Sequence, residues 1–244
     1  MNLRGGVIII GSLLWDDDEK TRRKKWRENY LCYKNRFKVY VPIRYGRCSR
    51  TRKNTYTMVF SNKCYLRRRY GLGTGWVLPI KVEINSFDKL KKEAKKMGET
   101  EGFKNDGFSS NWGSVALLLN PNKKINNSII TKWGNLMSNK ISNYLLSTKK
   151  LKSEKLPVDS KGFLTIRWPK EVIPKNKIGK FDFLIATVTA PKLINGKYPT
   201  AYQIADTMKE AKYYDYFCKN RKHGITTFQD EKILRRIQKN KLKK

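Results

Sequence analysis

Segments typical of strands and segments typical of helices alternate along the first part of the chain. Val7 to Gly11 is a short β-branched run that ends at a Gly-Ser pair, which predicts a buried strand entering a tight loop. Apolar and polar residues alternate from Phe37 to Tyr45, which predicts a half-buried strand with Pro42 at an edge position or a bulge. Apolar residues spaced by three and four from Phe87 to Met97 predict a helix that stops near Gly98. This interleaving predicts an α+β fold.

Composition divides the chain into three regions. Residues 1–148 carry the interleaved pattern and are predicted to form one α+β domain. Residues 149–180 are rich in lysine and proline and are predicted to be a linker or an insertion. Residues 181–244 begin with an alternating segment and continue with helical patterns, so we expect a C-terminal strand plus basic helices packed on the first domain.

The chain is strongly basic. Its 54 Lys and Arg residues stand against 20 acids, which gives a formal charge of +34. Between Lys20 and Lys53 there are 14 basic residues and one acid, Glu28. Such a field attracts polyanions, so nucleic acid is a possible partner, although charge runs also serve as plain solvated faces. No stretch reaches the roughly 18 apolar residues of a membrane span, which argues against an integral membrane protein.

Few residues are available for metal or triad chemistry. The four cysteines form no C-x-x-C pair and the only histidine is His223, so no metal site is expected. P-loop and dinucleotide-binding fingerprints are absent as well, so no cofactor is expected. The cysteines are interpreted as reduced thiols, which favours a cytoplasmic location. His223 lies in a basic Asn-Arg-Lys-His-Gly turn, which is a poor setting for a general base.

Two short segments are the candidates for chemistry. The turn after the first predicted strand, Gly11-Ser12-Leu13-Leu14, exposes backbone N–H groups that can hold a carboxylate or a developing oxyanion, although a plain strand-to-loop turn has the same sequence. Glu101 follows the Phe87 to Met97 helix and precedes Gly102 and Phe103. If these neighbours desolvate its carboxyl, its pKa rises and it becomes a usable general acid/base; the alternative is a solvated loop glutamate.

The pair, in this order and with strands between, resembles the gamma-glutamyl cyclotransferase-like superfamily. Its members carry a Tyr-Gly-Ser/Thr-x-Leu loop after the first strand and a catalytic glutamate in a Glu-Gly motif. The counterparts here are Gly11 to Leu14 and Glu101-Gly102 after Leu90. Gly11 to Asp16 is also similar to the Gly-Ser-Leu-x-Trp-Asp opening of an uncharacterised bacterial subgroup. The resemblance covers residues 7 to 120.

The resemblance implies a mixed sheet, often a small barrel, and a reaction that releases 5-oxoproline from a gamma-glutamyl compound without a cofactor. It implies that Glu101 is the catalytic acid/base and that the backbone of Gly11 to Leu14 binds substrate. The family's tyrosine before the glycine is replaced by Ile10. Arg44 and Arg47, in the segment Arg44 to Arg50 at the end of the alternating strand, are further candidates for binding an anionic substrate, although a solvated strand end has the same sequence.

The leading hypothesis is therefore an enzyme acting on a gamma-glutamyl-type or other small anionic amide. The alternatives are a non-enzymatic protein of the same fold that binds nucleic acid or another polyanion, or one that sequesters a small anionic metabolite. The segment Asn220 to Glu231 either folds over the predicted pocket or joins two helices; its sequence fits both.

Overall fold

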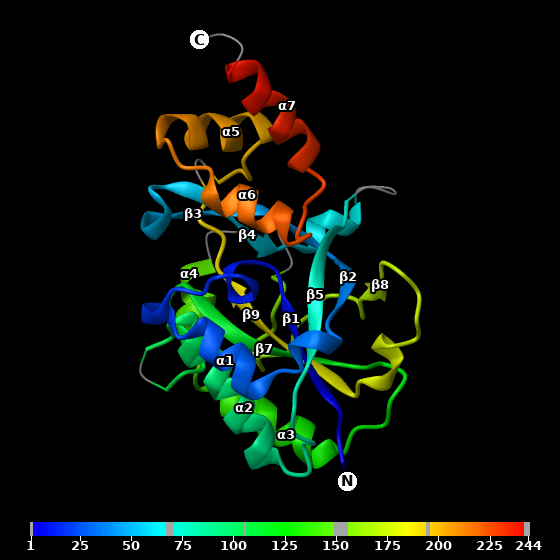
Figure 1. The fold of residues 1–244 in the computed structure, drawn as a ribbon. Coiled ribbons are helices and arrows are strands. Elements are labelled where there is room, and N and C mark those ends of the chain that lie inside the picture. Colours follow the sequence, from blue (N-terminus) through cyan, green and yellow to red (C-terminus); the bar gives the residue numbers. More distant parts are fainter. Residues whose placement is uncertain (1, 67–70, 105, 149–155, 194–195, 242–244) are drawn as a thin grey trace.

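A mixed seven-stranded sheet forms the centre of the computed structural model, which describes residues 2–66, 71–104, 106–148, 156–193 and 196–241. Its strand order is β6-β7-β9-β1-β5-β2-β8, and β3 and β4 form a separate two-stranded hairpin (Figure 1). The strands are β1 (Gly5–Ile9), β2 (Phe37–Val41), β3 (Ile43–Ser49), β4 (Thr55–Phe60), β5 (Gly73–Pro79), β6 (Ser109–Ser110), β7 (Gly113–Leu119), β8 (Lys170–Glu171) and β9 (Phe183–Thr189).

The predicted α+β class is confirmed. The described strands do not close into the small barrel that the family resemblance implied. The alternating segment from Phe37 to Tyr45 is not one strand, because the chain leaves the large sheet at Pro42. β2 before it pairs with β5, whereas β3 after it pairs with β4. Proline has no N–H to continue a ladder, which explains why the change of sheet falls there.

Strands from the first and the third predicted region, β1 and β9, lie side by side in the middle of the sheet. β1 pairs antiparallel with β5 and parallel with β9, and β9 also pairs antiparallel with β7. Every residue of β1 is buried, as a strand covered on both faces must be. The region 181–244 therefore shares its sheet with the region 1–148. In the predicted linker, residues 149–155 lie outside the described residues, while Val158, Leu164 and Ile166 are buried in the common core.

The helices gather at two ends of the sheet (Figure 1). α1, α2 and α3 lie around β7, and α5, α6 and α7 lie with the β3–β4 hairpin toward the C-terminus. α7 carries basic residues, as predicted for the C-terminal region. Their bounds are α1 (Arg23–Tyr30), α2 (Phe87–Glu101), α3 (Asn127–Ser138), α4 (Ser142–Thr148), α5 (Ala201–Glu210), α6 (Asp215–Lys222) and α7 (Asp230–Lys241).

Helix α2 runs one turn further than its sequence indicates. Gly98 does not end it. A Cβ there would lie 1.8 Å from the carbonyl oxygen of Gly107, so this glycine, within the helix, lets the loop at Gly107 pack directly against the helix backbone. The end comes at Gly102, whose left-handed φ of 98° suits glycine and whose N–H closes on the carbonyls of Gly98 and Glu99. Glu101 is consequently the last residue of α2 rather than a loop residue.

The start of α7 contains a buried acid, Asp230. Its Oδ1 accepts hydrogen bonds from the N–H and the hydroxyl of Thr227, at 2.9 and 2.6 Å, and its side chain is 2% exposed. Burial is the main cause that raises the pKa of Asp230 from its ordinary 3.8 to about 6; Arg221, 3.7 Å from Oδ2, opposes the rise. The environment of Asp230 thus favours its neutral, protonated form, and ionising this side chain in the folded protein costs free energy.

Asp230→Asn should therefore change the pH dependence of stability. An acid with a raised native pKa binds more protons folded than unfolded, so its contribution is greatest below the unfolded pKa and is lost as the pH rises through the folded one. Between about pH 4 and about pH 8, we expect the free energy of unfolding of the parent to fall by about 2 kcal/mol relative to Asp230→Asn. Denaturant unfolding of both proteins at a series of pH values measures this, and parallel curves would contradict it.

Candidate functional site

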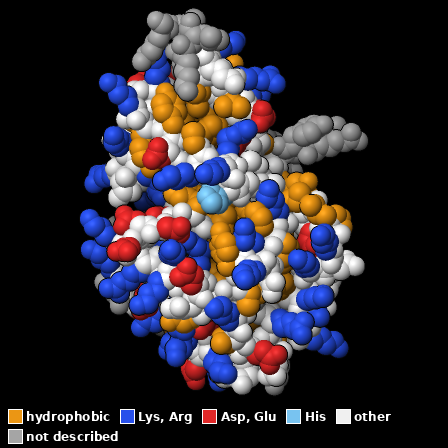
Figure 2. Space-filling view, viewed as in Figure 1, with side chains coloured by type: hydrophobic (Ala, Val, Ile, Leu, Met, Phe, Trp, Pro, Cys, Tyr) orange, Lys and Arg blue, Asp and Glu red, His pale blue; other side chains and the backbone are white. Residues whose placement is uncertain are grey.

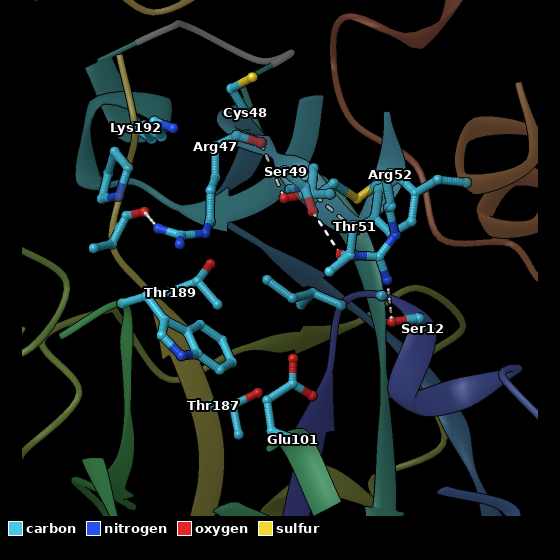
Figure 3. A pocket seen from close by; sticks show the side chains of 18 of the residues that line it. Ser12, Arg47, Cys48, Ser49, Thr51, Arg52, Glu101, Thr187, Thr189 and Lys192 are labelled. Carbon is cyan, nitrogen blue, oxygen red and sulfur yellow. Dashed lines mark hydrogen bonds between the residues drawn. The ribbon is translucent and has the colours of Figure 1, made fainter. Parts of the chain in front are cut away.

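A cavity of about 670 Å³ opens at the carboxyl ends of the parallel strands β1 and β9 (Figure 3). This is where ligands bind in open α/β sheets, because the chain leaves both strands there and the loops diverge. The loop after β1 forms one wall, the end of α2 brings Glu101, and the β3–β4 hairpin supplies the residues opposite. The lining side chains with polar groups include Ser12, Arg23, Arg47, Ser49, Arg50, Thr51, Arg52, Glu101, Asn111, Thr187, Thr189, Lys192 and Tyr216.

The turn after β1 is a single 3-10 turn, Ser12–Leu14, that begins at Gly11. The N–H of Leu14 bonds to the carbonyl of Gly11 at 3.0 Å, whereas the first amides of such a turn have no acceptor within it. Gly11 is extended, and a Cβ there would lie 2.9 Å from the hydroxyl of Tyr216. Glycine thus lets the α6 phenol sit directly on the turn. Gly11, Ser12 and Leu13 line the cavity, while Leu14 is buried and faces a separate groove.

Two arginines hold the Ser12 hydroxyl. Arg23 Nη1 and Arg52 Nη2 each donate to Ser12 Oγ, both at 2.7 Å. A hydroxyl has two acceptor positions and one proton, so Ser12 has only its proton left to offer a further partner. Arg23 is fixed in turn by Asp16 at 2.8 Å, and the Arg52 guanidinium lies 4.5 Å from the centre of the Tyr216 ring. The turn therefore presents hydrogen-bond donors and positive charge.

Glu101 enters the same cavity from the end of α2 (Figure 3). Its side chain is 16% exposed, and Oε2 is buried with no hydrogen bond from the described residues; Arg23 Nη2 lies 3.8 Å away. Burial is the largest influence and raises the pKa of Glu101; Arg23 and Arg52 oppose it, and Asp16 adds to it. The negative end of the α2 dipole acts in the same direction as burial. The Glu101 carboxyl is thus partly desolvated, a setting that suits proton transfer near neutral pH.

Arg47 faces the cavity from the hairpin. Its Nη1 donates to the carbonyl of Ala190 at 2.8 Å, and its guanidinium lies 5.6 Å from the centre of the Trp112 ring. Burial lowers the pKa of Arg47, which still leaves an arginine charged at neutral pH. Five cations line the cavity, against one carboxylate among the described residues, Glu101. This balance favours an anionic ligand.

Arg44 does not line this cavity. It is buried, and its guanidinium lies 4.0 Å from the centre of the Tyr198 ring and 5.6 Å from that of Phe228. The β3–β4 register shifts between Tyr45 and Arg47, so a bulge at Gly46 separates the two arginines. The structure thus brings Glu101 together with Gly11, Ser12, Leu13 and Arg47, but not with Leu14 or Arg44.

The segment Asn220 to Glu231 joins α6 to α7 and is not part of the lining. The Asn220 side-chain oxygen accepts a hydrogen bond from the Trp15 indole at 2.8 Å, which ties α6 to the turn after β1. Thr226 then pairs with Thr74 beside β5. The contribution of α6 to the cavity is Tyr216, which the sequence analysis did not single out.

Other lining residues were also missed. Arg23 and Arg52 belong to basic runs in which nothing distinguishes them from solvated neighbours. Thr187 and Thr189 are two residues apart in β9, and this spacing predicts that they lie on the same face of the strand. The spacing does not predict that β9 pairs with β1. No cluster of three or more His, Cys, Asp or Glu side chains that could hold a metal occurs among the described residues.

Comparisons with protein-family models, curated proteins and solved structures gave no match. Among the helices of the described ranges, none is both long and apolar enough to cross a membrane.

Proposed function

We propose that this protein is an enzyme of the gamma-glutamyl cyclotransferase-like type, acting on a small anionic gamma-glutamyl amide. The observation that carries the proposal is that Glu101 and the Gly11–Leu13 turn, far apart in the chain, line one cavity. These are the two motifs on which the resemblance rests. A partly desolvated carboxyl with an unbonded oxygen beside a donor-rich turn suits proton transfer during acyl chemistry.

The reaction is an intramolecular acyl transfer. The substrate's α-amine attacks its own γ-carbonyl carbon, and Glu101 accepts the proton that the amine loses. The bond between the γ-carbon and the leaving nitrogen then breaks, and Glu101 returns the proton to that nitrogen. The products are 5-oxoproline and an amine. Since attacking and leaving groups belong to one molecule, the enzyme contributes mainly positioning and proton transfer.

The donors of the cavity have matching roles. The proton of Ser12 and the guanidiniums of Arg23 and Arg52 are directed to a carboxylate of the substrate, because charge-assisted bonds of this kind are strong in a partly buried site. The amides at the start of the turn face the oxygen that becomes negative during attack. Ile10 lacks the family's tyrosine hydroxyl, and the Tyr216 hydroxyl, close to Gly11, offers a phenol from another element.

The experiment that tests the proposal is release of 5-oxoproline from a panel of gamma-glutamyl amides that differ in the leaving amine. We expect turnover of at least one member, with a preference for leaving groups that carry a second negative charge, since Arg47, Arg50 and Lys192 line the cavity as well. Binding of these compounds without turnover would contradict the enzyme and leave a metabolite-binding protein. If these compounds show no binding and no turnover, both the enzyme and the metabolite-binding protein are contradicted.

Arg52→Gln should weaken substrate binding more than it slows the chemical step. It removes a donor to Ser12 and a charge in the cavity, and a hydrogen bond to a charged group is typically worth about 1.5–3 kcal/mol. We expect KM to rise about 10- to 100-fold with a smaller change in kcat. Lys53→Gln is the matched control, because Lys53 is exposed, adjacent in the chain and outside the cavity lining. Equal effects of the two substitutions would show that Arg52 acts only through net charge.

A further inference from the structure

A second groove, of about 280 Å³, lies where the end of α6 and the turn after it meet Lys38 of β2 and Trp76 of β5. We call it the β2 groove and define it by Arg36, Lys38, Trp76, Arg221, Lys222 and His223. Figure 2 views this side of the molecule, with the single histidine in pale blue among Lys and Arg side chains. Among the residues that the structure describes, none of those lining the groove is acidic. It is separate from the cavity that holds Glu101.

Two cations of the β2 groove, Arg36 and Lys38, contact aromatic rings or a carbonyl group rather than acids. The Arg36 guanidinium lies 4.1 Å from the centre of the Tyr33 ring and 5.1 Å from that of Trp76, and Arg36 Nη1 donates to the carbonyl of Tyr33 at 3.0 Å. Lys38 Nζ lies 5.4 Å from the centre of the Trp76 ring. Such contacts fix the direction of a cation while leaving its charge uncompensated.

The positive charge is largely unpaired. Within the described chain, Arg36, Lys38 and Lys222 have no ion pair with an acid, whereas Arg221 pairs with Glu231 at 3.2 Å. Three unpaired cations that converge on one groove repel one another, and a bound anion removes that repulsion. The arrangement therefore favours a ligand with more than one negative charge.

An exposed aromatic side chain continues the groove along β2. Tyr40 is 41% exposed and lies on the same side of the strand as Lys38, two residues away. Lys170 of β8 is opposite Tyr40, as Trp76 of β5 is opposite Lys38. Cations and rings thus alternate along this face. Alternation of this kind is how proteins bind single-stranded nucleic acid, with the cations on phosphates and the exposed ring on a base.

We propose that the β2 groove binds single-stranded nucleic acid, with Lys38 and Lys222 contacting phosphates and Tyr40 stacking on a base. This activity is independent of the cavity, so Glu101→Gln should bind nucleic acid as the parent does. The exposed Tyr40 ring between Lys38 and Lys170 is the reason for choosing nucleic acid as the ligand. A nucleic acid has bases that stack on this ring, whereas an acidic protein segment or a polyanion without bases would contact only the lysines.

The test uses the full chain and a single-stranded oligodeoxynucleotide of about 12 nucleotides, a length within the usual range of such sites. Binding is measured at several salt concentrations for the parent, Lys38→Gln/Lys222→Gln and Lys91→Gln/Lys92→Gln. The last is a matched control, since Lys91 and Lys92 are exposed on α2 and their replacement removes the same charge. Each phosphate contact contributes about 0.7 to the salt slope for single strands, so the first variant should lose about 1.4 and the control almost nothing.

His223 reports on the groove directly because it is the only histidine. In the free protein burial, Lys222, Arg36 and Arg27 lower the pKa of His223, and Asp17 opposes them. Bound phosphates favour the imidazolium, so its NMR titration should move to higher pH when the oligonucleotide saturates the protein. Tyr40→Leu should weaken binding of the oligonucleotide about tenfold through lost stacking.

Three results would overturn the proposal. One is an equal loss of affinity in the two double variants, which would mean general attraction to a basic surface. Another is a His223 resonance that does not respond to saturating oligonucleotide. The third is binding of a hairpin duplex or of heparin as tight as that of the single strand, together with no effect of Tyr40→Leu, which would remove the role of base stacking.

Discussion

Glu101→Gln is expected to lower kcat for 5-oxoproline release by about 10²- to 10⁴-fold, the usual contribution of a positioned general acid/base. The substitution keeps the size of the side chain and its place at the end of α2, but glutamine cannot take a proton from the substrate amine. Substrate binding should change little, because Arg23, Arg52 and Ser12 remain. The measurement is steady-state kinetics on the best member of the gamma-glutamyl panel.

The pH profile separates a catalytic role from a structural one. Since burial raises the pKa of Glu101, the rise of kcat/KM with pH should have its midpoint above the ordinary range of a glutamate, and this limb should vanish in Glu101→Gln. Glu99→Gln is the matched control: Glu99 is an exposed acid two residues earlier on the same helix. Equal losses in the two variants, or an unchanged profile in Glu101→Gln, would remove Glu101 from the mechanism.

Gly98→Ala is expected to destabilise the protein by about 3 kcal/mol, at the upper end of ordinary overpacking. The new Cβ would lie 1.8 Å from the carbonyl oxygen of Gly107 and 2.9 Å from Val115 Cγ2, so backbone must move. The helix-propensity gain of alanine over glycine, about 1 kcal/mol, is too small to offset this. Denaturant unfolding measures the change in free energy.

Gly134→Ala is the control for this prediction. Gly134 is also a buried glycine inside a helix, α3, but the atoms nearest to a Cβ there belong to the flexible Lys161 side chain, at 3.6 to 3.8 Å. We expect it to be neutral or to stabilise the protein by up to about 1 kcal/mol. If Gly98→Ala is as stable as Gly134→Ala, the close contact between α2 and the Gly107 loop is not what sets the position of the helix.

The effect of Gly98→Ala should reach the candidate site. Glu101 lies one turn after Gly98, so a helix pushed away from Gly107 carries the carboxyl out of the cavity. At a temperature where the variant is still folded, its kcat should fall with little change in the circular dichroism of the helices. Unchanged kcat in the folded variant would contradict the link between this contact and Glu101.

Local patterns in the sequence were sufficient for the class of fold and for the two motifs of the candidate site. The apolar run before Gly11 is a buried strand, and Glu101 does line a cavity with the turn that follows it. Both features depend on neighbours within a few residues, which is the range over which periodicity and turn chemistry act.

Features that depend on distant pairing were not predicted. The cavity lies where β1 and β9 end side by side, and the residue pattern of a single strand does not predict which strand pairs with it. The end of helix α2 was predicted at the wrong glycine for the same reason. Gly98 allows close packing against Gly107, whereas Gly102 adopts the left-handed conformation that ends the helix. The sequence alone does not distinguish these two roles. Arg44 and Arg47 are three residues apart and were equivalent candidates, but the bulge between them separates their environments.

The most direct test of the proposed site is an NMR titration of the glutamate side-chain carboxyls in the parent protein, with Glu101→Gln to assign the signal, in the absence and presence of 5-oxoproline. We predict that Glu101 titrates above the ordinary glutamate range and that its signal shifts when 5-oxoproline is added, while that of Glu99 does not. A Glu101 signal that titrates in the ordinary range and ignores 5-oxoproline would contradict the assignment of this cavity as an acid/base site for gamma-glutamyl chemistry.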